Sequence, residues 1–83
     1  MAKLNDCELQ ERLITISENL SGRKVGLNSK FSDDLEFDSM DFNDLCIAIE
    51  VLGFDFDKVL NYCMTNRNIT VGELATYLVS LKK

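Results

Sequence analysis

The chain has no histidine and no proline, and only three of its 83 residues are cysteine. Without histidine the commonest general base is missing, so neither a Ser–His nor a Cys–His nucleophile pair can form within the chain. The cysteines form no C-x-x-C pair and have no histidine to complete a zinc site, so we expect reduced, partly buried thiols at Cys7, Cys46 and Cys63. The sequence therefore predicts no metal site, no catalytic residue and no enzymatic activity of its own.

Long hydrophobic runs are missing as well. No apolar stretch approaches the roughly 18 residues that span a bilayer, and the first ten residues, MAKLNDCELQ, lack the apolar block of a secretory signal. We therefore expect a cytoplasmic protein with no membrane segment. The apolar fraction of 46% predicts a folded chain, and the length suits a single domain over residues 1–83 that buries about 60% of its unfolded surface.

Basic residues are absent from residues 31–57, although this segment holds nine acids. Its charge is −9, and the net charge of −5 leaves +4 for the rest of the chain. Such a segment repels nucleic acids and anionic lipids and attracts basic protein surfaces. The alternative is a solvated face, although solvated faces usually mix both signs. The acids are Asp33, Asp34, Glu36, Asp38, Asp41, Asp44, Glu50, Asp55 and Asp57.

Apolar spacing predicts helices at both ends of the chain. Within residues 4–20 apolar side chains recur at steps of four, three and four, the pattern of an amphipathic helix, at Leu9, Leu13, Ile16 and Leu20. Ser21 and Gly22 are typical of its end. Near the other end Thr70 and Glu73 form a capping box, and apolar residues follow on one helix face at Leu74, Ala75, Leu78 and Leu81.

Two further helices are expected between these. A second stripe, at Leu45, Ala48, Ile49 and Leu52, predicts a helix that begins near Ser39 and ends at Gly53. A third, shorter helix is predicted by Phe56, Val59, Leu60 and Cys63, with Asp55 or Asp57 as its cap. Residues 23–38 show no period, so the predicted fold is an all-α four-helix bundle with a long first loop and a short third helix.

The acids before the second helix do not match a calcium-binding loop. A loop starting at Asp33 would have Leu35 at its third position and Asp38 where glycine is needed. The carboxylates also lack the apolar pocket that would raise one pKa for acid catalysis. What remains is one serine, Ser39, enclosed by acids in FSDDLEFDSMDF, residues 31–42.

This stretch resembles the signature of acyl carrier proteins. The matching pattern is F-x-D-D-L-x-x-D-S-M-D over residues 31–41, where the family has an Asp-Ser-Leu triplet, often followed by another acid, at the start of its second helix. The chain length, the four-helix order, the long first loop, the acidic second helix and a final helix starting at Thr70 also correspond. The resemblance covers residues 4–81.

The resemblance implies that a phosphopantetheinyl transferase moves phosphopantetheine from coenzyme A onto Ser39. The arm's thiol would then hold acyl groups as thioesters, for fatty acid, polyketide or related biosynthesis. The other implied partners are acyl-transferring and synthase enzymes with basic patches, which a monomeric carrier would meet through its second helix. The implied docking residues are Asp38, Met40, Asp41, Asp44 and Glu50.

Other roles for these residues stay open. Ser39 or Asp38 is also a favoured helix cap. Apolar side chains such as Met40, Ile47, Leu60 and Tyr77 are expected in the core, and the resemblance implies that an acyl chain can shelter between the second and third helices.

The chain departs from the family pattern in several places. Glu36 and Phe37 stand where the family has glycine and a small residue, Met40 replaces the usual leucine, and residues 53–68 lack the usual proline. These departures indicate a specialised carrier. The alternatives are a peptidyl or aminoacyl carrier, against which the charges of Asp38 and Asp41 argue, and an unmodified acidic helical module that binds a basic partner.

Overall fold

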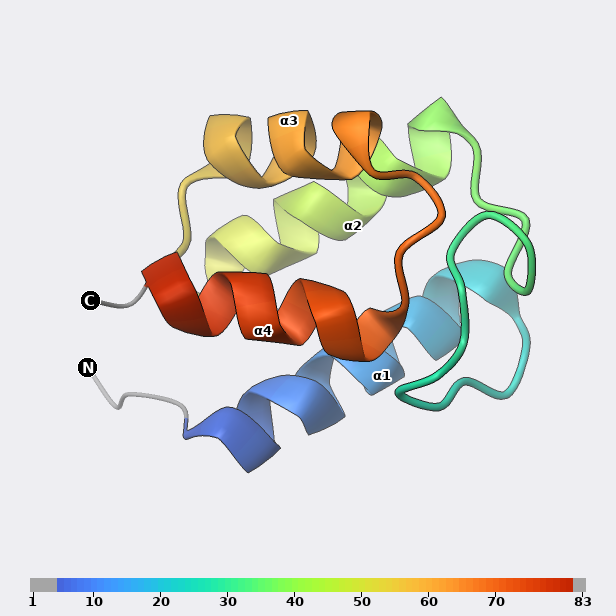
Figure 1. Cartoon of the computed structure of the whole chain (residues 1–83), viewed down its shortest axis with the longest axis horizontal. Helices are drawn as coiled ribbons and strands as arrows, with labels where there is room; N and C mark the ends of the chain where they lie inside the picture. The colour runs from blue at the N-terminus through green and yellow to red at the C-terminus, as the bar shows by residue number, and fades with distance from the viewer. Residues whose placement is uncertain (1–4, 82–83) are drawn as a thin grey trace.

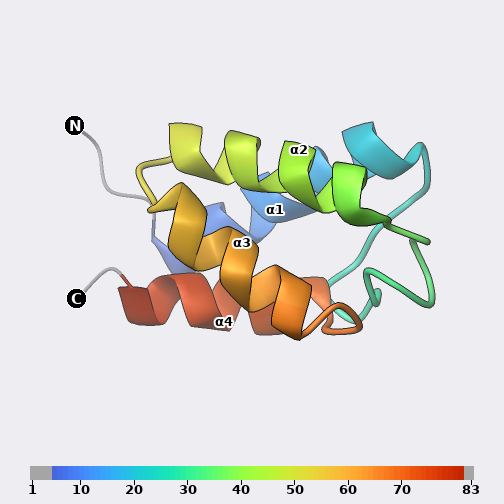
Figure 2. The same cartoon turned by 90° about the horizontal axis from the view of Figure 1, so that it is seen from above.

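The computed structural model describes residues 5–81, and within them it is all-helical (Figure 1). The helices run in alternating directions, with α2 against α3 and α1 against both α2 and α4 (Figure 1 and Figure 2). The expected small helical bundle is confirmed, while residues 1–4, 82 and 83 of the predicted domain lie outside the described residues. The helices are α1 (Asp6–Ser21), α2 (Ser39–Val51), α3 (Phe56–Thr65) and α4 (Val71–Leu81).

Helix α1 begins with a capping box that the apolar pattern did not predict. The side chain of Asn5 accepts the N–H of Glu8 at 2.8 Å, and the Glu8 carboxylate accepts the N–H of Asn5 at 3.2 Å. The predicted stretch began at residue 4, which lies outside the described residues. The predicted end is confirmed, because Gly22 adopts a φ of 70° and its N–H donates to the carbonyl of Glu18 at 2.9 Å.

Aspartates cap the two middle helices. Helix α2 begins at Ser39 as predicted, and its N-cap is Asp38. Helix α3 is capped by Asp55, whose side chain accepts the N–H of Lys58 at 3.1 Å. Between the two helices Gly53 takes a φ of 106°, a left-handed conformation that glycine adopts without steric cost.

Helix α4 starts against the long first loop. The predicted capping box is present, with the Glu73 N–H donating to Thr70 at 3.1 Å and the Thr70 N–H donating to Glu73 at 2.9 Å. An isolated β-bridge joins Lys30 to Thr70, and the N–H of Phe31 donates to the carbonyl of Ile69 at 3.0 Å. The connection between α3 and α4 is therefore tied to the loop that leads to α2.

Buried apolar residues from all four helices and the first loop form one core. Three loop and helix phenylalanines, Phe31, Phe37 and Phe42, contact one another with ring centroids 5.2–5.7 Å apart. Phe31 and Phe42 are fully buried, and so are Leu9, Leu13, Leu45, Cys46, Ile49, Val59, Cys63, Val71, Leu74 and Leu78.

The expectation that Met40 and Ile47 belong to this core is wrong. Their side chains are 76% and 46% exposed. Helix α2 is apolar on more than one face, but α1 and α3 cover only the face that includes Leu45 and Ile49, which leaves Met40 and Ile47 in solvent. Leu60 and Tyr77, in contrast, are half-buried and pack against the core.

Candidate functional site

Ser39 is the first residue of α2, and its side chain is exposed. The neighbouring capping box leaves the hydroxyl free of a capping role. The Asp38 carboxylate accepts the N–H of Asp41 at 2.9 Å, and the Asp41 carboxylate accepts the N–H of Asp38 at 3.2 Å. Of the two cap candidates, Asp38 therefore caps the helix, and the Ser39 hydroxyl faces solvent beside it.

A basic side chain reaches this hydroxyl from a distant part of the sequence. The Nη2 group of Arg67 donates a hydrogen bond to Ser39 Oγ at 2.9 Å. The same nitrogen donates to the sulfur of Met64 at 3.4 Å. Arg67 lies in the connection between α3 and α4, so the site joins the start of α2 to the end of α3.

The residues on either side of Arg67 are fixed by hydrogen bonds. The backbone and the side-chain N–H groups of Asn66 both donate to the carbonyl of Tyr62, each at 3.0 Å. The side chain of Asn68 bonds to Asp33 twice, accepting its N–H and donating to its carboxylate, each at 3.0 Å. The short connection thus holds the base of the Arg67 side chain close to Ser39.

The nine acids of residues 31–57 divide into two groups. Six accept hydrogen bonds from the described residues and so shape the loop and the helix starts: Asp33, Asp34, Glu36, Asp38, Asp41 and Asp55. The carboxylates of the other three accept none within residues 5–81: Asp44, Glu50 and Asp57. Six of the nine acids therefore have a local structural use within residues 5–81, whereas no such use is found there for the carboxylates of the second group.

The outer face of α2 combines acids with exposed apolar side chains. Met40 is 76% exposed, Ile47 46% and Val51 81%. Together with Asp44 these residues follow the 3.6-residue period and share one face of the helix. Of the predicted docking residues, Asp38, Met40, Asp44 and Glu50 are exposed and Asp41 is half-buried. We call Met40, Ile47 and Val51 the outer strip of α2.

Glu36 and Phe37, the bulky residues before the Asp-Ser pair, have structural roles. Phe37 is 6% exposed, and its ring is tilted against Phe31 and edge-on to Phe42, so its bulk fills the core beside these rings. Glu36 has a φ of 55°, in the left-handed region that favours glycine. Its carboxylate pairs with Arg23 at 3.0 Å.

Two thiols meet where α2 and α3 pack together. Cys46 and Cys63 are both fully buried, whereas Cys7 is exposed, and no disulfide joins the three. A hydrogen bond with Cys46 and burial raise the pKa of Cys63 well above that of a free thiol. The thiol of Cys63 is therefore protonated at neutral pH, and its contribution is to packing.

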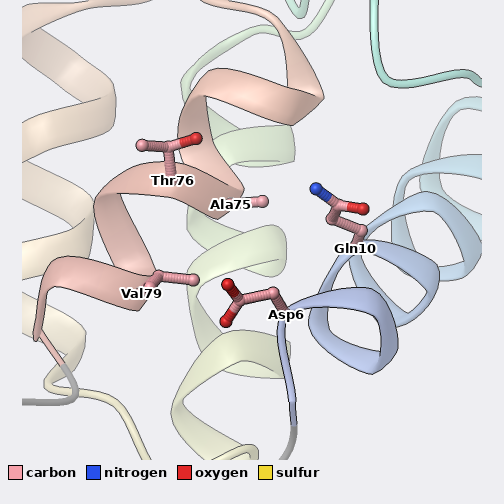
Figure 3. A pocket seen from close by; sticks show the side chains of 5 residues that line it. All are labelled: Asp6, Gln10, Ala75, Thr76 and Val79. Atoms are coloured by element: carbon pink, nitrogen blue, oxygen red, sulfur yellow. The ribbon is translucent and has the colours of Figure 1, made fainter.

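A small pocket lies at the other end of the bundle, between α1 and α4 (Figure 3). Its volume is about 120 Å³, well below the roughly 300 Å³ at which ligand sites of small molecules begin. The residues that line it are Asp6, Gln10, Ala75, Thr76 and Val79. The start of α2 therefore remains the candidate site.

Two residues at this site were not predicted from the sequence. Arg67 is 28 positions from Ser39, and nothing in its local pattern indicates the contact. Val51 was detectable, because it continues the helical spacing of Met40, Asp44 and Ile47.

Comparison with known proteins adds no assignment to this geometry. None of the helices within residues 5–81 is both long enough and apolar enough to cross a bilayer. No protein-family model, no curated protein and no solved structure matches the chain.

Proposed function

We propose that the chain is an acyl carrier protein in which Ser39 bears a phosphopantetheine arm. The main supporting observation is the exposed Ser39 hydroxyl at the first position of α2. This hydroxyl does not cap the helix, because Asp38 does so. When bound, the arm supplies a thiol that holds acyl groups as thioesters. This role explains why a reactive position can exist in a chain that has no histidine: the serine is modified by another protein.

The residues around Ser39 fit a phosphodiester. The N–H groups of Ser39 and Met40 have no hydrogen-bond partner within the described residues, and they lie at the positive end of the α2 dipole, which favours an anion. In the attachment step the Ser39 oxygen bonds to a phosphorus of coenzyme A, and the bond from that phosphorus to 3′,5′-ADP breaks. The hydroxyl proton passes to a base of the transferase.

The outer face of α2 is the surface that we assign to partner docking. The carboxylates of Asp44 and Glu50 accept no hydrogen bond within residues 5–81, so their charges are available to attract basic patches on a transferase or an acyl-transferring enzyme. The outer strip of α2 adds apolar area that a partner can bury. Contacts of this kind favour rapid encounter and release, which suits a carrier.

The test is the intact mass of the purified chain after incubation with coenzyme A and a broad-specificity phosphopantetheinyl transferase. We expect one added phosphopantetheine on the wild-type chain and none on Ser39→Ala. The matched control is Ser32→Ala, which changes a serine of the same acidic segment and is expected to load normally. An unmodified wild-type chain in the presence of a transferase that loads another carrier would refute the proposal.

A second candidate function is an unmodified module that binds a basic partner. The observation in its favour is the outer strip of α2, because exposed apolar side chains beside unpaired acids are typical of a protein interface. This function needs α2 but does not need the Ser39 hydroxyl. The mass measurement separates the two candidates. If the chain loads, a thioester exchange with acyl and with aminoacyl donors then distinguishes an acyl carrier from a peptidyl or aminoacyl carrier.

A further inference from the structure

Arg67 is the one basic side chain bonded to Ser39 in the described structure, and it comes from a different element. The bonded atom, Ser39 Oγ, is the atom that would bridge the protein to the arm. We propose that Arg67 is a positioning residue that binds the phosphodiester at Ser39 and fixes the first point of the arm. This inference rests on the proposed function and adds a role that the sequence did not predict.

The donors of Arg67 suit this role. Once Ser39 Oγ is esterified to phosphorus, the non-bridging phosphate oxygens lie only two bonds from Oγ. They are therefore close to the guanidinium group that donates to Oγ. Only Nη2 of Arg67 donates within residues 5–81, to Ser39 and to Met64, so Nη1 and Nε remain available. A planar guanidinium can bind two phosphate oxygens at once, which a lysine ammonium cannot do in the same fixed geometry.

The charge of Arg67 is also available. No carboxylate of the described residues lies within 4.0 Å of its guanidinium, and the ion pair found within residues 5–81 joins Arg23 to Glu36 instead. The acids nearest to Ser39 in the sequence are Asp38 and Asp41. The carboxylate of each accepts the backbone N–H of the other. A phosphodiester at Ser39 adds one negative charge among these acids, and Arg67 offsets the resulting repulsion.

The position of Arg67 is set before any arm is attached. Asn66 is bonded to the last turns of α3, and Asn68 is bonded twice to Asp33 in the first loop. Because the backbone on both sides is already ordered, binding the phosphodiester costs mainly the rotamer freedom of one side chain. The contact is exposed, so it is weak enough to break when a partner takes the arm.

The experiment is a thermodynamic cycle of the apo and the loaded chain in the wild type and in Arg67→Gln. Urea unfolding gives the ratio of unfolding constants between loaded and apo forms. We expect the arm to stabilise the folded wild type more than it stabilises folded Arg67→Gln. The two ratios should differ by between about 1.5-fold and fivefold, the range for an exposed charge pair. Arg67→Lys should retain only part of this coupling, because it keeps the charge and loses the planar fork.

A ³¹P NMR spectrum of the loaded chain provides an independent readout at the phosphodiester itself. We expect the phosphorus shift to differ between the wild type and Arg67→Gln, and the difference to shrink as salt is added. The control is Arg23→Gln, which removes another exposed arginine and should leave the phosphorus shift unchanged.

The outcomes separate this inference from the proposed function. If the wild-type chain gains no arm, both are wrong. If the wild type and Arg67→Gln both load but show equal coupling and the same phosphorus shift, only the role of Arg67 is wrong. An equal effect from Arg23→Gln would also refute it, because the result would then reflect general charge.

Discussion

Helices α2 and α4 begin with the same capping device, yet the two starts differ in what they leave open. In α2 Asp38 and Asp41 cap each other, and in α4 Thr70 and Glu73 do the same. The first N–H groups of α4 are then satisfied by the long loop, since Val71 donates to Ser29 at 3.0 Å and Gly72 donates to Leu27 at 2.9 Å.

The start of α2 has no such cover. Within the described residues the N–H groups of Ser39 and Met40 have no partner, and Ser39 is exposed where its counterpart Val71 is fully buried. A capping box therefore fixes the residue at which a helix begins, but it does not determine whether that helix start is buried or open to a ligand. At α4 the start joins two loops, and at α2 it presents a hydroxyl beside Arg67.

The largest expected effect is on loading, in Ser39→Ala. The substitution removes the attachment oxygen, so we expect the mass gain to vanish completely. Because Asp38 provides the cap, the free energy of unfolding measured in urea should fall by no more than about 0.5 kcal/mol. A loss near 2 kcal/mol would show instead that the serine stabilises the start of α2 as much as a helix cap does.

Exchanging the two first residues tests the contrast from the other side. Val71→Ser removes buried apolar contacts and places a hydroxyl in the core, so it should lower the free energy of unfolding by about 2–4 kcal/mol. The matched variant Ser39→Val should change it by less than about 1 kcal/mol, because this position is exposed. Similar losses in the two variants would contradict the description of α2 as the open start.

The cap of α2 can be separated from its charge. Asp38→Ala removes the acceptor of the Asp41 N–H and should cost about 1 kcal/mol in urea unfolding, as should Thr70→Ala at α4. Asp38→Asn keeps an acceptor and should stay within a few tenths of a kcal/mol of the wild type. If the charge of Asp38 also steers the transferase, Asp38→Asn should load more slowly at low salt despite its unchanged stability. Equal loading rates would limit Asp38 to capping.

Much of this arrangement was predictable because it depends on local rules. Apolar spacing and caps placed all four helices, including the start of α2 at Ser39 and the capping box of α4. These features arise within a few residues of sequence, where the backbone and one or two side chains determine the structure.

The contacts that complete the site were not predictable in this way. The bond between Arg67 and Ser39 and the pair of bonds between Asn68 and Asp33 connect residues far apart in sequence. The exposure of Met40 and Ile47 depends on which face of α2 its neighbours cover, and an apolar pattern on several faces does not indicate this. Phe37 was interpreted as a bulky departure, whereas the tertiary fold provides a place for it in the core.

The smallest expected effect concerns the charge around the two starts. The start of α2 lies in a segment of charge −9, whereas the rest of the chain carries +4. Since charges at separations beyond about 10 Å are screened at 0.1 M salt, added salt should weaken the repulsion and raise the melting temperature by a few degrees, equivalent to up to about 1 kcal/mol. The double variant Asp44→Asn/Glu50→Gln neutralises two acids whose carboxylates accept no hydrogen bond within residues 5–81. Its melting temperature should therefore be higher at low salt and less sensitive to salt. The matched control is Asp33→Ala/Asp38→Ala, which makes the same change in charge at hydrogen-bonded acids and removes both acceptors, so it should lose stability. A wild-type melting temperature that stays level across the titration would mean that the +4 of the rest of the chain already compensates the acids around α2.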